Sequence, residues 1–257
     1  MRRYCIALLL LGFVASCGND AHVRFATLIH YDDFPGSAVD LSKWSVDLTG
    51  NGSTGTASAT VANGRATLDL TATSGDIQSS LVFPAGLVGS IGMIGTRTTL
   101  VSYGQGLSPS NVRFRLYTRS YKDNKYASGP PPDRFSDIFA QLRIRTGQFH
   151  AMVSRCTDST CSTSENIFGP TVLGVATLGQ SYDLLLTWNG GSIFHFDVKG
   201  VGSATFDASE GLYTRVGDSG VPRSKVEVIA DTGTPTTGIA TATVDYVDCG
   251  RWDADLC

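Results

Sequence analysis

The chain has little glutamate, a modest share of charged residues and, after its first residues, no long hydrophobic run. Its 257 residues include only three glutamates, Glu165, Glu210 and Glu227, and charged residues make up 17% of the total. No stretch after Val14 approaches the ~18 consecutive apolar residues that a transmembrane helix needs. Amphipathic periodicity of the helical kind is also hard to find. The composition therefore argues against a membrane-spanning helix in the body of the chain and against a helical fold.

The N-terminus has the composition of an export signal. Arg2 and Arg3 precede an apolar run that ends at Val14, and small residues follow, which is the usual order of a secretory signal peptide. The four residues 14–17, Val-Ala-Ser-Cys, resemble the bacterial lipobox. This resemblance implies that Cys17 is acylated and becomes the new N-terminus.

The lipobox resemblance predicts the organisation of the chain. Residues 1–16 are expected to be a lipoprotein signal peptide, residues 17–27 a lipidated tether, and residues 28–257 a single domain of a length typical of large β folds. Gly18 follows the cysteine in place of Asp, which by the usual sorting rule of lipoproteins favours anchoring to the outer membrane. Lipid chains would hold the domain at that membrane by hydrophobic burial.

An alternative interpretation of the N-terminus remains open. An ordinary signal peptide cut near Ala15 or Ala21 would leave Cys17 without a role. Either way, loss of Arg2 and Arg3 leaves 18 Lys and Arg against 23 Asp and Glu, a formal charge of −5. This balance argues against a general nucleic-acid partner.

Four cysteines remain after the signal and the lipidated residue are set aside. They fall in two close pairs, Cys156 with Cys161 and Cys249 with Cys257. Export and the short separations favour disulfides within each pair over the two other connectivities. A metal-thiolate site is the less favoured alternative, because an oxidising compartment disfavours free thiols.

Short β-rich segments alternate with turn residues throughout the domain. Turn residues recur every eight to twelve positions, a spacing typical of an all-β sandwich. Asn63-Gly64 lies between two alternating runs and suits a tight hairpin turn, because both positions tolerate positive φ. Further strands are expected at 111–119, 137–145, 148–155, 225–231 and 240–249, with a hairpin over 182–200. The pattern predicts more than ten strands in two packed sheets.

Four segments resemble the concanavalin A-like lectin/glucanase superfamily. "YDDFPGSAVDLSKWSVD" (31–47) is similar to the opening of many such domains, and "NGRATLDLTA" (63–72) to the strand that follows it. "TATVDYVDC" (241–249) resembles the closing strand of glycoside hydrolase family 16, and "YDLLLTWNGGSIFHFDVKG" (182–200) a hairpin of laminin G-like domains. The resemblance implies a two-sheet antiparallel jelly roll with a ligand groove on its concave face.

The resemblance also implies features that can be checked residue by residue. Family 16 enzymes carry two glutamates on one strand, about 5 Å apart for retaining hydrolysis. Here the corresponding strand reads "FSDIFAQLRIRTG" (135–147) and contains no glutamate, so the motif is missing.

Many domains of the superfamily hold a structural Ca²⁺ through an Asp of the closing strand. Asp245 matches that position, and carbonyls near residues 32–36 would be further ligands. No other cofactor is expected.

Arginines gather on two of the expected groove strands. In 111–119 and 137–145, apolar residues alternate with polar ones, so each strand has one apolar and one arginine-bearing face. The polar positions are Arg113, Arg115, Tyr117, Arg119, Gln141, Arg143 and Arg145. If the strands are neighbours, these residues form a binding face for a polysaccharide or glycoconjugate, acidic in character, because arginine forks match carboxylates and sulfates. The alternative is that the arginines only pair with Asp residues across strands on a solvated face, at less than about 1 kcal/mol per pair.

Two other classes of function remain open for the same chain. The first is a polysaccharide lyase or a divergent glycoside hydrolase that acts in the same groove. An alginate-lyase type of polysaccharide lyase needs an Arg or Gln for the uronate carboxylate and a His or Tyr for proton transfer. Gln141, Arg143, His150 and Tyr117 supply those residue types, with His150 predicted on the face opposite Phe149, although the motifs of such lyases and those of hydrolases are missing. A structural or adhesive envelope lipoprotein is the third class. The leading hypothesis is a membrane-anchored, non-catalytic carbohydrate-binding lipoprotein.

Overall fold

The computed structural model describes residues 29–84, 91–103, 112–123, 134–188, 193–207, 213–215, 223–230 and 238–251. The predicted signal and tether, including Cys17, lie outside these ranges. Within them, no helix has the length and apolarity that a membrane crossing requires.

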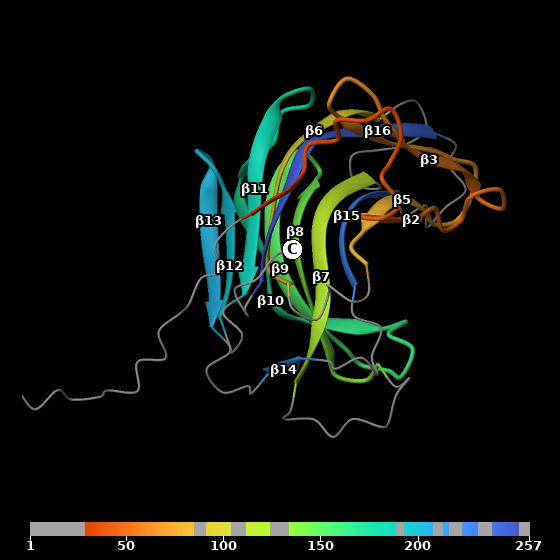
Figure 1. The fold of residues 1–257 in the computed structure, drawn as a ribbon. Coiled ribbons are helices and arrows are strands. Elements are labelled where there is room, and N and C mark those ends of the chain that lie inside the picture. Colours follow the sequence, from red (N-terminus) through yellow and green to blue (C-terminus); the bar gives the residue numbers. More distant parts are fainter. Residues whose placement is uncertain are drawn as a thin grey trace, which may run out of the picture.

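The described residues form two antiparallel sheets (Figure 1). Sheet A has the order β13-β12-β11-β6-β16-β4-β3, and β1 pairs with β16. Its strands are β1 (Ile29–Asp32), β3 (Gly55–Val61), β4 (Ala66–Ala72), β6 (Ile91–Tyr103), β11 (Ser181–Trp188), β12 (Ile193–Val198), β13 (Gly202–Asp207) and β16 (Gly238–Arg251). Sheet B has the order β10-β9-β8-β7-β15-β5-β2, and β14 pairs with β7. Its strands are β2 (Ser45–Asp47), β5 (Ile77–Val82), β7 (Val112–Asp123), β8 (Asp137–Arg145), β9 (Gln148–Cys156), β10 (Ser164–Val175), β14 (Tyr213–Arg215) and β15 (Arg223–Ala230).

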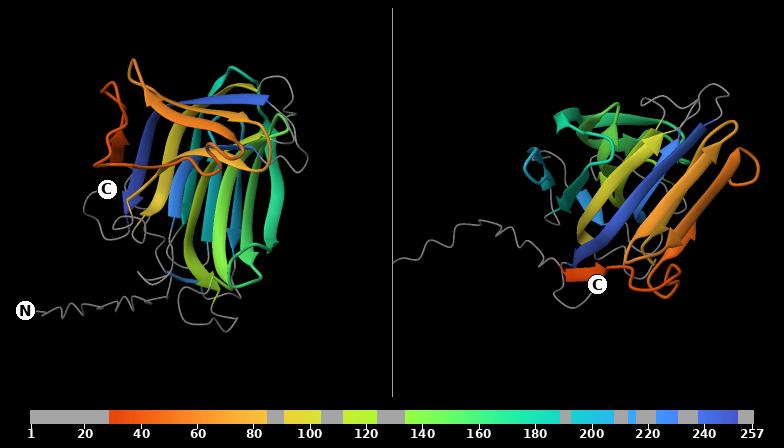
Figure 2. Two further views of the ribbon diagram at one scale, coloured as in Figure 1. Left: turned by 90° about the vertical axis from the view of Figure 1, so that its right-hand side faces the viewer. Right: turned by 90° about the horizontal axis from the view of Figure 1, so that it is seen from above.

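The two sheets stack as curved layers, and β7 bends visibly along its length (Figures 1 and 2). Alternate residues of each strand fill the space between the layers, because side chains of a strand point to opposite faces. Phe114 and Phe149 of sheet B and Leu68 and Phe196 of sheet A are fully buried there. A hydrogen bond from Ser79 Oγ to the carbonyl of Ser58, 2.6 Å, joins the sheets directly. The predicted two-sheet antiparallel sandwich is confirmed.

The hairpin predicted at Asn63-Gly64 is present between β3 and β4. Val61 lies opposite Ala66, and φ is 55° at Asn63 and 67° at Gly64. Asparagine and glycine are the residues that adopt this left-handed backbone most readily. The turn therefore sets the register of the two strands, as the sequence indicated.

A buried carboxylate explains the opening motif of the domain. Asp32 accepts hydrogen bonds from the Trp44 indole, at 2.7 Å, and from the Phe34 backbone N–H, at 3.1 Å. Phe34, Trp44 and Phe83 are almost fully buried, and the Trp44 ring contacts Tyr31, Phe34 and Phe83. The acidic residue and the aromatic residues of "YDDFPGSAVDLSKW" thus pack one corner of the sandwich.

The cysteines agree with the predicted pairing where the structure describes them. Cys156 and Cys161 form a disulfide, which excludes a metal-thiolate site for this pair. The enclosed loop is braced by Asp158, whose carboxylate accepts hydrogen bonds from the backbone N–H groups of Thr160, Ser162 and Thr163. Cys249 is also disulfide-bonded, but Cys257 lies outside the described residues, so their pairing stays a prediction.

The two adjacent aspartates of the opening motif provide a matched test of this corner. Asp32→Ala should reduce the free energy of unfolding by about 1–3 kcal/mol, because it leaves the Trp44 indole N–H buried without an acceptor. Asp33→Ala should change it by less than about 0.5 kcal/mol, since the Asp33 side chain is 63% exposed. Urea unfolding of both variants measures the difference, and equal losses would contradict a structural role for Asp32.

Candidate functional site

The face of sheet B that points away from sheet A is polar, and most of it is nevertheless withdrawn from solvent. Strands β7 and β8 place Phe114, Leu116, Leu142 and Ile144 in the core, as predicted, and the arginines that alternate with them lie on this face. Tyr117, Gln141, Arg143 and His150 are each less than 10% exposed. We call this surface the outer face of sheet B.

Four arginines form a compact group on this face. Strands β7 and β8 are neighbours, and their register places Arg113 opposite Arg145 and Arg115 opposite Arg143. Directly opposed residues of a strand pair lie about 5 Å apart at Cβ, and like charges in that position destabilise a sheet. We call Arg113, Arg115, Arg143 and Arg145 the arginine block. Its two opposed like-charge pairs concentrate positive charge at the middle of the sheet.

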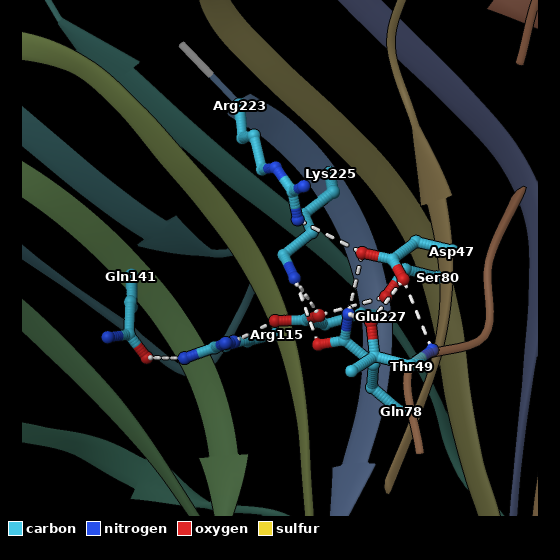
Figure 3. Close-up of polar contacts among 9 residues, drawn as sticks. All are labelled: Asp47, Thr49, Gln78, Ser80, Arg115, Gln141, Arg223, Lys225 and Glu227. Carbon is cyan, nitrogen blue, oxygen red and sulfur yellow. Dashed lines mark hydrogen bonds and ion pairs between the residues drawn. The ribbon is translucent and has the colours of Figure 1, made fainter. Parts of the chain in front are cut away.

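A buried glutamate lies next to the arginine block. Glu227 of β15 is opposite Arg115 and is fully buried. Its carboxylate forms ion pairs with Arg115 and Lys225 and accepts a hydrogen bond from Ser80 Oγ at 2.9 Å (Figure 3). Arg115 also donates to Gln141 Oε1 at 2.9 Å. The guanidinium of Arg115 is therefore held between two strands.

The charges in this cluster shift the pKa values of its members. Burial alone would raise the pKa of Glu227, but Arg115 and Lys225 outweigh it and lower the pKa to about 2. Burial lowers the pKa of Lys225, although Glu227 opposes the shift. Glu227 is thus an anion at neutral pH that compensates the buried Lys225 and the partly buried Arg115.

The cluster extends across β5 to β2. Lys225 donates to Gln78 Oε1 at 3.2 Å, and Gln78 donates to Asp47 Oδ2 at 2.7 Å. Arg223 also pairs with Asp47, at 3.0 Å (Figure 3). Burial opposes the ionisation of Asp47, but hydrogen bonds from Thr49 and Gln78 lower its pKa overall. The carboxylates of this end of the face are therefore already engaged by protein donors.

The other predicted binding residues occupy different surroundings. The Tyr117 ring lies under Arg115, 4.8 Å from the guanidinium carbon to the ring centre, and contacts Phe139. Arg119 is 5% exposed and lies 4.0 Å from Asp137, away from the block. Arg113 and Arg145 are half-buried. The structure thus groups Arg113, Arg143 and Arg145 at one region of the face, while Arg115, Tyr117 and Arg119 also support the sheet itself.

His150 lies beside the arginine block. It is opposite Arg143 and on the face away from Phe149, as predicted. Burial, followed by Arg143 and Arg145, lowers the pKa of His150, so the imidazole is neutral at pH 7. The four residue types of the lyase alternative are brought together, because Tyr117 is opposite Gln141 and Arg143 is opposite His150.

The carboxylate of the predicted calcium ligand, Asp245, is engaged by two arginines. Asp245 Oδ1 lies 2.6 Å from Arg65, and Oδ2 lies 3.5 Å from Arg97. Both oxygens of the carboxylate face a cation, so they are poorly suited to a Ca²⁺ ion, which takes six to eight oxygen ligands. Among the described residues, no group of three or more His, Cys, Asp or Glu could hold a metal. Asp245 thus takes part in surface ion pairs, and its role as a calcium ligand stays a prediction.

Comparison with solved structures establishes the fold as the concanavalin A-like jelly roll. A variant of SCLam, a non-specific endo-β-1,3(4)-glucanase of glycoside hydrolase family 16 co-crystallised with an oligosaccharide, aligns with a TM-score of 0.55 and 14% identity, covering 89% of this chain and 95% of that one. Unmutated SCLam aligns with a TM-score of 0.51 and 14% identity, covering 86% and 89%.

A third structure gives the same fold. A protein of unknown function from Shewanella oneidensis MR-1 aligns with a TM-score of 0.53 and 11% identity, covering 90% of this chain and 88% of that one. No protein-family model and no curated protein sequence matches the chain. These similarities show the fold of the chain, and its function depends on the residues of the outer face of sheet B.

The sequence analysis missed Glu227, Lys225 and their partners on β5 and β2. The alternation of "KVEVIAD" does place Lys225 and Glu227 on one face. It cannot show that β15 pairs with β7, since Arg115 and Glu227 are 112 positions apart. Of the three glutamates, Glu227 is the one that the described residues place on this face, and its burial removes it from contact with a ligand.

The pair of Arg115 and Glu227 can be tested by a double-mutant cycle. Arg115→Ala should cost about 3–5 kcal/mol of unfolding free energy, because a fully buried carboxylate loses one of its two cations. In a Glu227→Gln background the same substitution should cost much less, since no buried anion remains. Chemical denaturation of the four proteins measures the coupling, and an equal cost in both backgrounds would refute it.

The low pKa of Glu227 predicts acid sensitivity. Because its pKa is depressed from 4.5 to about 2 in the folded state, its contribution to stability is present above pH 4.5 and is lost as the pH falls toward 2. The loss should amount to roughly 3 kcal/mol. Urea unfolding between pH 5 and pH 2 should therefore show a steeper decline for the wild type than for Glu227→Gln, and parallel curves would contradict the assignment.

Proposed function

We propose that this protein is an exported, lipid-anchored bacterial protein whose jelly roll binds an acidic polysaccharide on the outer face of sheet B, without cleaving it. The arginine block carries the proposal. It brings four guanidinium groups together on two neighbouring strands, and arginine forks bind carboxylates and sulfates with two parallel hydrogen bonds.

The charge of the whole face supports an acidic ligand. Its described cations include Arg113, Arg115, Arg119, Lys122, Arg143, Arg145, Arg223 and Lys225, and its described carboxylates include Asp47, Asp137 and Glu227. The carboxylates are engaged with Arg115, Lys225, Arg223, Arg119 and Lys122. Cations therefore outnumber carboxylates on this face, although the mature chain is acidic overall.

The rest of the proposal rests on the N-terminal sequence and on fold analogy. The signal-like residues 1–16 and Cys17 support export and attachment to the outer membrane by lipid. The similarity to a glucanase crystallised with an oligosaccharide adds fold-level support for a sugar ligand. The absence of the two-glutamate motif from "FSDIFAQLRIRTG" supports binding without retaining hydrolysis.

A double substitution separates binding from folding. Arg143→Ala with Arg145→Ala should weaken binding of polygalacturonate at least about tenfold per arginine, because each lost charged hydrogen bond is worth about 1.5–3 kcal/mol. Arg115 is avoided because its loss would destabilise the protein. Affinity electrophoresis against acidic and neutral polysaccharides measures retardation, and thermal unfolding checks that the fold is unchanged.

The matched control removes two arginines from the opposite side of the molecule. Arg65→Ala with Arg97→Ala changes the net charge equally, but on the outer face of sheet A, and should leave retardation nearly unchanged. Equal weakening by both double variants would show that only net charge matters. If no polysaccharide retards the wild type, the proposed function is wrong and a structural or adhesive envelope role becomes the better hypothesis.

A lyase is the second candidate function. The observation in its favour is that Gln141, Tyr117, Arg143 and His150 lie as two opposed pairs on adjacent strands. Arg143 and Gln141 could neutralise a uronate carboxylate while the neutral His150 accepts a proton. Growth of ultraviolet absorbance from an unsaturated uronate product, followed over hours with polygalacturonate and alginate, would assign lyase activity in place of simple binding.

A further inference from the structure

We infer that His150 is part of the ligand site, and that its imidazole takes up a proton when an anionic group of the glycan binds against the arginine block. This inference rests on the proposed function, because it specifies how that same face responds to an anion. It adds one residue and one measurable property, proton-linked binding, to the site.

The position of His150 carries the argument. It is 9% exposed, and its Nδ1 atom has no hydrogen-bond partner among the described residues. Buried polar atoms are nearly always paired, and one that is not calls for an explanation such as a ligand or a catalytic role. His150 is opposite Arg143 on β8, so a group held by Arg143 would lie within reach of the imidazole.

The surroundings explain why the proton is absent until a ligand binds. On β8, Arg143 is opposite His150, and Arg145 and Gln141 are its diagonal neighbours. On β10, the opposite residue is the uncharged Val172. The two charged residues that shift the pKa of His150, Arg143 and Arg145, are thus both positive. Together with burial they lower its pKa and keep it neutral at pH 7.

A bound anion reverses this balance. A carboxylate or sulfate at Arg143 compensates the positive charge around His150 and stabilises the imidazolium, so the pKa of His150 rises on binding. By linkage, binding then takes up a proton, and affinity increases as the pH falls through the raised pKa of the complex. Each pKa unit of increase corresponds to a tenfold gain in affinity.

Dextran sulfate oligomers and unsulfated dextran form a matched pair of probes. Sulfate esters stay ionised between pH 8 and pH 5, so any pH dependence belongs to the protein. For the wild type we expect affinity for dextran sulfate to rise about tenfold over this range, with proton uptake seen by calorimetry in two buffers of different ionisation enthalpy. His150→Gln should bind with a flat pH profile, and its melting temperature reports whether it folds.

Histidine NMR gives a test that does not depend on the variant. Titration of the His150 ring signals with and without dextran sulfate should show a higher pKa in the complex, while His30 and His195, which belong to sheet A, stay unchanged. Inorganic sulfate should produce the same upward shift without a sugar. An unchanged His150 pKa, or an equal shift with unsulfated dextran, would overturn the inference.

The outcomes distinguish this inference from the proposed function. Binding of dextran sulfate with no pH dependence, or with a dependence that His150→Gln retains, would leave the glycan site standing and reject the role of His150. Failure of the wild type to bind any acidic polysaccharide at any pH would reject both.

Discussion

The buried carboxylate of Glu227 is the interaction on which the arginine face depends. It lies in the centre of sheet B between Arg115 and Lys225, and these two cations keep it ionised although burial opposes its charge. Without this anion, Arg115 and Lys225 would both be cations on a largely buried surface, next to three further arginines. Glu227 therefore allows the sheet to hold a high density of positive charge without losing its fold.

Each carboxylate on the outer face of sheet B compensates the charge of the cations directly beside it. Arg115 is satisfied by Glu227 and Gln141, and Arg223 by Asp47. Arg143 and Arg145 lie on the far side of β7 from Glu227 and opposite other arginines. The proposed ligand contacts, with His150, thus lie on the other side of β7 from Glu227.

The fold and many residues of the outer face of sheet B could be predicted from the sequence. The reason is that apolar and polar residues alternate clearly along β7, β8 and β9. The alternation could not set their register, since a shift of two residues leaves every side chain on the same face. The pairing of Arg113 with Arg145 therefore could not be predicted.

Two strands were not predicted from the sequence. In β6, Gly92 and Gly95 interrupt the alternating pattern, and in β10 most residues are exposed. The ion pairs of Asp245 with Arg65 and Arg97 could not be predicted, because both arginines are distant from it in sequence.

Binding of an acidic polysaccharide at the arginine block would bring its anionic groups against the guanidinium groups. The most direct measurement is a guanidinium Nε–Hε NMR spectrum of the protein, titrated with oligogalacturonate. We expect the signals of Arg113, Arg143 and Arg145 to shift saturably, while those of Arg65 and Arg97 on sheet A do not. Shifts confined to Arg65 and Arg97, or none at all, would contradict it.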